Sequence, residues 1–191
     1  MEEPAVTLAG WVLGNFPYAP PLSHLKLQKL VFYGYGMLLA QDLEPEFGPA
    51  LVFEPWKHGP VNRAVWHQYR DQGSAPLRAE PPTALYPSRV ESALRDALAV
   101  YGLLNPWQLC EQSHLEAPWQ QAYELQARQI DPAFLKLHFK RKCLPDQVTP
   151  PELLLDTMGF SLDQLPPPRY PSFHEMAERL GRNARRDRGG L

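Results

Sequence analysis

The placement of proline limits the fold of this chain more than any other feature of its sequence. The 22 prolines among 191 residues are about double the usual share of about 5%. Many stand where an apolar pattern of helical period begins, and proline is accepted in the first turn of an α-helix but breaks a helix interior. We therefore expect a mainly α fold, with a single helical domain of about seven short helices.

Other residues also mark helix starts and ends. Ser23 can cap a helix that is apolar on most sides, so we expect this helix to lie at the centre of the domain. Ser88 and Glu91 have the spacing of a capping box. Glycine follows several of the apolar stripes, as it does at many helix C-termini. The expected helices begin near Pro4, Ser23, Pro60, Ser88, Pro106, Pro118 and Pro132.

A small β element is expected before the third helix. Residues 50–53 are prone to strand formation and are bounded by Pro49 and Pro55, so they suit a brief strand better than a helix. Gly59 and Pro60 then open the third helix in this interpretation.

The amino-acid composition of the chain changes near residue 145. We expect one domain over residues 1–145, followed over residues 146–191 by a Pro-rich linker and a basic C-terminal helix. Six arginines and three acidic residues give residues 169–191 a charge of +3, although the whole chain carries −2. This last helix is a candidate partner-binding surface, with apolar and basic side chains from Phe173, Met176, Arg179, Leu180 and Arg182.

Nothing in the sequence is typical of a membrane protein. The apolar runs are shorter than the roughly 18 residues that a span needs, and the acidic start Met-Glu-Glu-Pro does not resemble a signal peptide. A chain of this length needs no disulfide, so we expect Cys110 and Cys143 to be reduced thiols in a cytoplasmic protein. We expect Cys110 to face the core.

Histidine and glutamate occur without the spacing of a metal site. A zinc site would draw on His24, His58, His67, His114 and Glu116, but the chain has no His-Glu-x-x-His motif and no paired cysteines. It also has no phosphate loop, dinucleotide fingerprint or nucleophile elbow. We therefore expect no cofactor, no metal and no catalytic activity.

A thiol triad of Cys110, His114 and Glu116 would require a continuous helix from the cysteine to the histidine. The sequence Glu116-Ala117-Pro118 indicates that the helix has already ended, so we do not expect this triad.

A buried polar arrangement is the remaining possibility. If His58 meets the turn that carries His114, a carboxylate or a carbonyl would hold His114, and Trp56 and Trp119 would shield the pair from water. Such residues either hold two helix starts to the core or line a binding site, and the sequence leaves both readings open.

The chain carries, in order, motifs at residues 25–33, 38–40 and 54–61, at Tyr69, and at residues 113–119. These motifs resemble those of the Panacea domain, a SocA-like antitoxin family often found near phage and mobile-element genes. The resemblance runs from about residue 4 to residue 140. The family usually reads Ala-Trp where this chain has Pro55-Trp56, and Thr-His where it has Ser113-His114. The motif positions are Lys26, Gln28, Lys29, Tyr33, Trp56, His58, Gly59, Pro60, Val61, Tyr69, His114, Glu116, Pro118 and Trp119.

The resemblance implies a mainly helical domain with a small β element, and an antitoxin that neutralises a protein toxin encoded nearby. Neutralisation would use direct binding, with or without delivery of the toxin to a protease. The shared motifs would support the scaffold, while variable surfaces, including the loop at residues 74–87, would select the toxin. Two alternatives stay open: a DNA-binding regulator that uses the Arg-rich tail, and a hydrolase that uses His58, His114 and Glu116.

Overall fold

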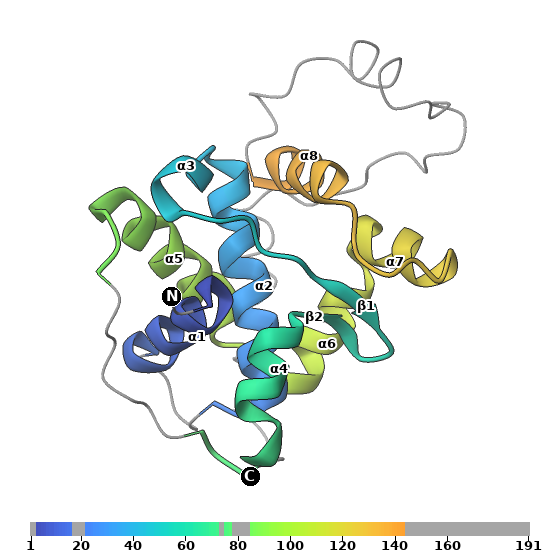
Figure 1. The fold of residues 1–191 in the computed structure, drawn as a ribbon, viewed down its shortest axis with the longest axis horizontal. Helices are drawn as coiled ribbons and strands as arrows, with labels where there is room; N and C mark the ends of the chain where they lie inside the picture. The colour runs from blue at the N-terminus through green and yellow to red at the C-terminus, as the bar shows by residue number, and fades with distance from the viewer. Residues whose placement is uncertain (1–2, 17–21, 73–74, 78–84, 144–191) are drawn as a thin grey trace, which may run out of the picture. The chain divides into compact units, whose positions relative to one another are not determined.

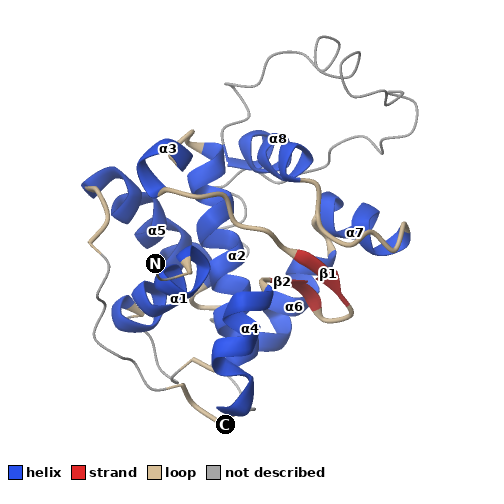
Figure 2. Ribbon diagram, viewed as in Figure 1, coloured by secondary structure: helices blue, strands red, loops and turns tan. Residues whose placement is uncertain are grey.

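The computed structural model describes residues 3–16, 22–72, 75–77 and 85–143. Within these ranges the chain is mainly helical with a small two-stranded sheet, which confirms the predicted fold class (Figures 1 and 2). The described residues up to Phe139 belong to one compact unit, Met1–Phe139, and residues 140–143 belong to a second. The predicted linker and C-terminal helix, with Phe173, Met176, Arg179, Leu180 and Arg182, lie outside the described residues.

The described residues form eight α-helices, one more than the number predicted, because the short helix α3 carries no strong sequence signal. None of these helices is long and apolar enough to cross a lipid bilayer. A single 3-10 turn, η1 (Arg70–Gln72), follows the fourth helix. The helices are α1 (Pro4–Asn15), α2 (His24–Ala40), α3 (Glu44–Phe47), α4 (Arg63–Tyr69), α5 (Ser88–Tyr101), α6 (Pro106–His114), α7 (Ala117–Glu124) and α8 (Pro132–Cys143).

Helix α2 is the central element, as its apolar character predicted (Figure 1). The Ser23 hydroxyl caps it by accepting from the Lys26 N–H at 3.4 Å, and every residue from Lys26 to Ala40 is buried. Gly36 allows a close approach, because a Cβ there would stand 2.3 Å from the ring of Phe139. Burying a leucine or phenylalanine contributes about 1.5–3 kcal/mol, so the apolar faces of α2 are a major source of stability.

The start of α5 differs from the prediction. The N-cap is Pro87, and Ser88 is the first helical residue and makes no capping bond, so the predicted capping box with Glu91 is wrong. A residue with helical backbone angles cannot take the cap position, and the extended backbone of Pro87 already provides it. The apolar residues at helical spacing, Val90, Leu94, Ala97, Leu98 and Tyr101, are all buried and form the inner face of α5.

The sheet is a hairpin of two strands, β1 (Glu54–Trp56) and β2 (Gly59–Val61). The predicted strand at residues 50–53 is therefore wrong, as is the predicted helix start at Pro60. The two strands pair antiparallel, with Pro55 opposite Pro60. Alternate positions of an antiparallel pair exchange no hydrogen bonds, so two prolines that lack N–H groups can stand opposite each other.

Asn62 explains why the strand and the helix both lie later in the chain than predicted. Its side-chain oxygen accepts from the Val65 N–H at 3.1 Å, which makes it the N-cap of α4. Its amide N–H group donates to the Val52 carbonyl at 2.9 Å, and the Phe53 carbonyl accepts from the Ile130 N–H at 2.8 Å. The carbonyls of Val52 and Phe53 are thus satisfied by partners outside any strand.

Candidate functional site

Most of the motif residues meet where α2 faces the hairpin and the turn between α6 and α7. We call this region the motif junction and define it by the inward-facing side chains and backbone of Gln28, Lys29, Tyr33, Gly59, Pro60, Asn62, Cys110, Ser113, His114, Glu116, Trp119 and His138.

Lys29 is the most buried charged residue of the motif junction. Its side chain is 0% exposed, and its Nζ donates to the Pro60 carbonyl at 3.0 Å. Removal from water lowers the pKa of Lys29 to about 7, and the nearby Cys110 thiol opposes this shift. Glycine at position 59, with φ +91°, leaves the necessary room: a Cβ there would lie 2.7 Å from Lys29 Nζ and 2.2 Å from Ser113 Oγ.

Gln28 fixes the end of the hairpin to α2. Its side-chain Nε2 donates to the Asn62 carbonyl at 3.1 Å, and its Oε1 accepts from the Asn62 N–H at 3.0 Å. The amide side chain thereby imitates a neighbouring strand. Lys26, two residues earlier, donates to the Gly102 carbonyl at 2.7 Å and so binds the C-terminal end of α5.

Glu116 is buried between two other side chains. It is 1% exposed, and its Oε1 accepts from the Tyr33 hydroxyl at 3.0 Å while its Oε2 lies 2.6 Å from His138 Nε2. Burial, followed by the charge of Glu116, raises the pKa of Tyr33 well above its ordinary value. A carboxylate held in this way joins α2, the start of α7 and α8, and it has almost no surface left for a substrate.

The structure corrects the sequence interpretation of Cys110 and His114. Helix α6 continues through His114, so the two side chains lie one turn apart, with Cys110 Sγ 3.7 Å from His114 Nε2. The thiol donates to the His58 carbonyl at 3.3 Å. Burial raises the pKa of the Cys110 thiol and lowers that of the His114 imidazole. The pair therefore consists of a neutral thiol and a neutral imidazole rather than a reactive thiolate.

His58 and His114 lie near each other, since Cys110 contacts both the His58 carbonyl and the His114 ring, and a carbonyl holds His114. The His114 ring donates to the Lys57 carbonyl and stacks on Trp119 with ring centres 4.3 Å apart. The exposed His58 ring meets Trp107 edge to face instead.

The two tryptophans of the motifs act differently. Trp119 is 7% exposed and covers the His114 ring by stacking on it, and its indole N–H donates to the Trp56 carbonyl at 3.2 Å. The Trp56 backbone thus borders the motif junction, while the Trp56 ring packs against Trp66. Of the remaining motif positions, Val61 and Pro118 are buried, and Tyr69 lies on α4 beside the His24 ring.

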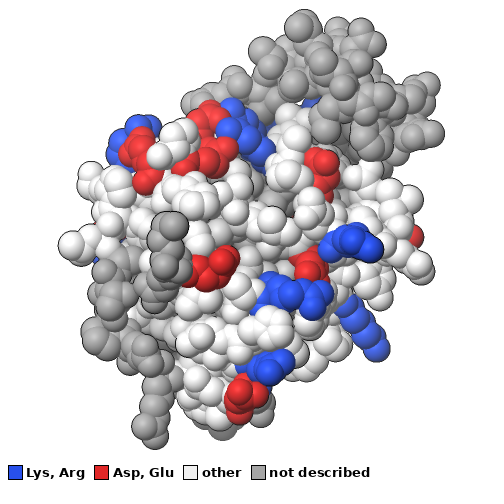
Figure 3. Space-filling model, viewed as in Figure 1, with Lys and Arg blue, Asp and Glu red and all other residues white. Residues whose placement is uncertain are grey.

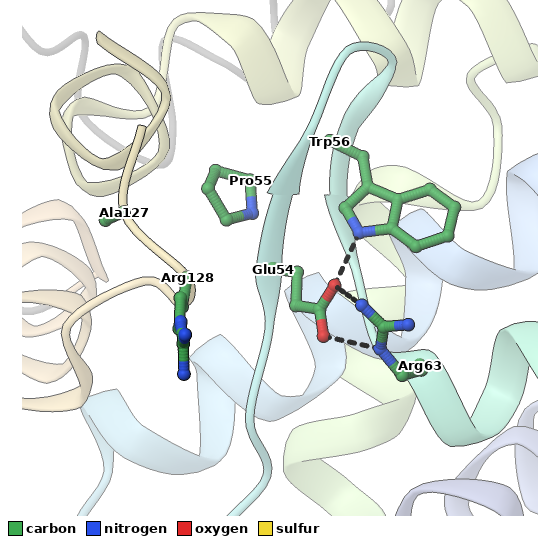
Figure 4. A pocket seen from close by; sticks show the side chains of 6 residues that line it. All are labelled: Glu54, Pro55, Trp56, Arg63, Ala127 and Arg128. Atoms are coloured by element: carbon green, nitrogen blue, oxygen red, sulfur yellow. Dashed lines mark hydrogen bonds and ion pairs between the residues drawn. The ribbon is translucent and has the colours of Figure 1, made fainter. Parts of the chain in front are cut away.

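A pocket of about 390 Å³ opens on the other side of the hairpin (Figure 4). Glu54 receives bonds of 2.7 Å from Arg63 Nε, from the Arg63 terminal nitrogen and from the Trp56 indole N–H. The Arg63 guanidinium lowers the pKa of the Glu54 carboxyl group. We call this the outer pocket, and its lining residues are Glu54, Pro55, Trp56, Arg63, Ala127 and Arg128.

Sequence reasoning missed three residues that are important here. Asn62 had a detectable signal, since asparagine before an apolar helical pattern is a frequent N-cap. His138 had none, because its contact with Glu116 joins residues 22 apart that no local pattern connects. Arg128, on a wall of the outer pocket, lies in a connection without periodicity.

The histidines do not form a metal site in the described part of the chain, where no group of three His, Cys, Asp or Glu side chains is placed to hold an ion. No protein-family model, curated protein or solved structure matches this chain. The relation to the Panacea family therefore stays a prediction from the motifs.

Proposed function

We propose that this chain is a non-catalytic antitoxin of the Panacea type, which neutralises a partner toxin by direct protein binding. The supporting observation is the closed bonding of the motif junction. Lys29 bonds to Pro60, and Gln28 bonds to Asn62. Glu116 bonds to both Tyr33 and His138. The side chains of Lys29, Gln28 and Glu116 are at most 3% exposed. A catalytic acid or base must reach its substrate, so this arrangement favours a scaffold role for the motifs.

The exposed surface supports binding to another protein. Three large apolar side chains on and beside α6 are more than half exposed: Leu103 at 61%, Trp107 at 62% and Leu115 at 64%. Exposed apolar groups of this size are typical of interaction surfaces, and tryptophan is frequent among the residues that dominate binding energy. We expect the toxin to contact this side of α6.

Thiol-dependent hydrolysis is a second candidate, which the 3.7 Å contact between Cys110 and His114 favours, and it would require His114 to take the proton of a thiol that is neutral at rest. The predicted hydrolase of His58, His114 and Glu116 has less support, because Glu116 is bonded to Tyr33 and His138. The DNA-binding alternative rests on the Arg-rich tail, which lies outside the described residues.

Growth of cells that express the neighbouring open reading frame tests the proposal. We expect the neighbour to arrest growth, the full chain to restore it, and the two proteins to co-purify. Gly59→Ala should abolish the rescue because it disrupts the motif junction, while Gly10→Ala, where a Cβ would meet nothing within 4 Å, should rescue fully. A harmless neighbour, or rescue without any complex, would contradict direct neutralisation.

Cys110→Ser separates the two candidate functions. An antitoxin that acts by binding should retain rescue with serine at this buried position, whereas a thiol hydrolase should lose it. A version that ends after Lys142 shows in the same assay whether residues beyond it carry toxin recognition.

A further inference from the structure

The outer pocket is formed by three parts of the chain that are far apart in sequence. Glu54, Pro55 and Trp56 come from β1, Arg63 from the start of α4, and Ala127 and Arg128 from the connection between α7 and α8. In Figure 4, Glu54 lies between Arg63 and Arg128, and the Pro55 ring lies on the side of Ala127 and Arg128.

Backbone bonds hold the walls of this pocket in place. The Ile130 N–H donates to the Phe53 carbonyl at 2.8 Å, which ties the connection after α7 to the residue just before β1. The Ala127 N–H donates to the Ala122 carbonyl at 2.9 Å and so fixes the start of the same connection to α7. Preformed walls reduce the ordering cost of binding.

The charges of the outer pocket leave one guanidinium without a counter-charge. Arg63 neutralises Glu54 through two hydrogen bonds of 2.7 Å. The Trp56 indole N–H donates a third hydrogen bond to the same carboxylate. Arg128 makes no hydrogen bond or ion pair with any other described residue. The six lining residues together carry a net charge of +1, which one monovalent anion would balance.

We propose that the outer pocket receives a carboxylate from an acidic segment of a protein partner, with Arg128 as its direct ligand. A guanidinium matches the two oxygens of a carboxylate. The Pro55 ring, on the same side of β1 as Arg128, provides apolar surface for the methylene groups of a glutamate or aspartate side chain (Figure 4). This inference rests on the proposed function only in naming the toxin as the partner that carries the carboxylate.

A nucleic-acid backbone fits the outer pocket less well. Phosphodiester recognition uses successive basic groups along a stripe, whereas here the Glu54 carboxylate stands between the two arginines (Figure 4). The space-filling view agrees, because basic and acidic side chains are interspersed over that face instead of forming a basic band (Figure 3).

A short acidic peptide tests the pocket without the toxin. The probe is acetyl-Ala-Glu-Ala-amide added to the full chain, with acetyl-Ala-Gln-Ala-amide as its control, and the readout is the NMR signal of the Trp56 indole N–H. This group bonds to Glu54 Oε2, so it reports directly on the pocket. We expect a saturable shift with the glutamate peptide only.

Substitutions locate the binding group. Arg128→Gln should weaken the glutamate peptide about fivefold, since an exposed ion pair contributes up to about 1 kcal/mol, and Arg128→Lys should weaken it less. Arg89→Gln, at an exposed arginine paired with Glu46, should have no effect. Equal shifts with both peptides, equal binding by Arg128→Gln, or a stronger response to a thymidine oligonucleotide would overturn the proposal.

The complex with the neighbouring gene product separates this proposal from the antitoxin proposal. If the complex forms and Arg128→Gln weakens it up to about fivefold while Arg89→Gln leaves it unchanged, both proposals are supported. If the complex forms but Arg128→Gln changes neither it nor the peptide shift, the pocket proposal fails and the antitoxin proposal stands. If no complex forms and the glutamate peptide still binds, the antitoxin proposal fails and the carboxylate site stands.

Discussion

The two sides of the β hairpin use the same kinds of residues for opposite purposes. On the inner side, Glu116 is 1% exposed and bonded to Tyr33 and His138. On the outer side, Glu54 has a side chain that is 21% exposed and is paired with an arginine at the surface. A buried charge stabilises only when its partners stay in place, and no other molecule can reach it. An exposed ion pair contributes little to folding but can take part in recognition.

Among the substitutions that test this comparison, Gly59→Ala should lower the free energy of unfolding most, because it forces a side chain into the motif junction. The new Cβ would stand 2.2 Å from Ser113 Oγ at a φ of +91°. We expect the free energy of unfolding, measured with urea, to fall by about 4 kcal/mol from strain and overpacking.

Two other glycines serve as controls for this substitution. Gly48→Ala has a φ of +124° but meets nothing within 4 Å, so it should cost about 2 kcal/mol of backbone strain alone. Gly10→Ala lies inside α1 with open space and should stabilise by about 1 kcal/mol. A loss at Gly59 no greater than that at Gly48 would show that the motif junction is not tightly packed.

Glu116→Gln should have the next largest effect. The amide keeps the shape of the carboxylate but removes the charge that Tyr33 and His138 share, and breaking a buried pair costs about 3 kcal/mol. Urea unfolding measures the loss. A change as small as that of Glu54→Gln would mean that the buried and exposed glutamates contribute equally, which would contradict the comparison.

Lys29 should make stability depend on pH in the neutral range. Its pKa is about 7 in the folded protein and near 10.5 when unfolded, so the unfolded chain binds more protons between these values. The free energy of unfolding should therefore rise with pH, by roughly 2 to 3 kcal/mol from pH 6 to pH 9. The full cost of burying the charge is present below pH 7.

Lys29→Met isolates this contribution. Unfolding curves of the variant should lack the rise between pH 6 and pH 9, and the difference from the unchanged protein removes the effects of other groups. Tyr33 and Cys110, whose pKa values are raised, titrate at higher pH in both proteins. Parallel pH profiles for the two proteins would rule out a depressed pKa at Lys29.

Glu54→Gln should have the smallest effect on folding. Because Arg63 lowers the pKa of Glu54, the ion pair stabilises above the ordinary pKa of a glutamate and is lost as the pH falls through the folded pKa. We expect only a minor change of the urea midpoint at pH 7, and one that salt reduces further. If Glu54→Gln lowered the urea midpoint strongly even in high salt, the ion pair of Glu54 and Arg63 would be important for folding, which would contradict the comparison.

Prediction from the sequence was correct where the signal lies within a few consecutive residues. The start of α6 is an example: Asn105 and Gln108 form a capping box just before and within a helix whose first residue is Pro106. It failed at the hairpin, where Gly59 and Pro60 resemble a helix start but pair with β1. The deciding contacts there come from Gln28 and Lys29, which are 34 and 31 residues away from their partners.

The candidate site divides in the same way. The sequence motifs singled out Lys29, His114 and Glu116. No local pattern predicted which residues bond to them. Tyr33 is 83 residues from Glu116. Arg128 joins the outer pocket only because the Ile130 N–H meets the Phe53 carbonyl.

The sequence by itself determined the helical class, the central position of α2 and most helix starts, because proline, capping residues and apolar spacing act over a few residues. The tertiary structure alone decided where the strands pair, which carboxylate is buried and which arginine remains exposed. Those outcomes depend on contacts between distant segments, and their energies come from burial and desolvation that exist only once the chain has folded.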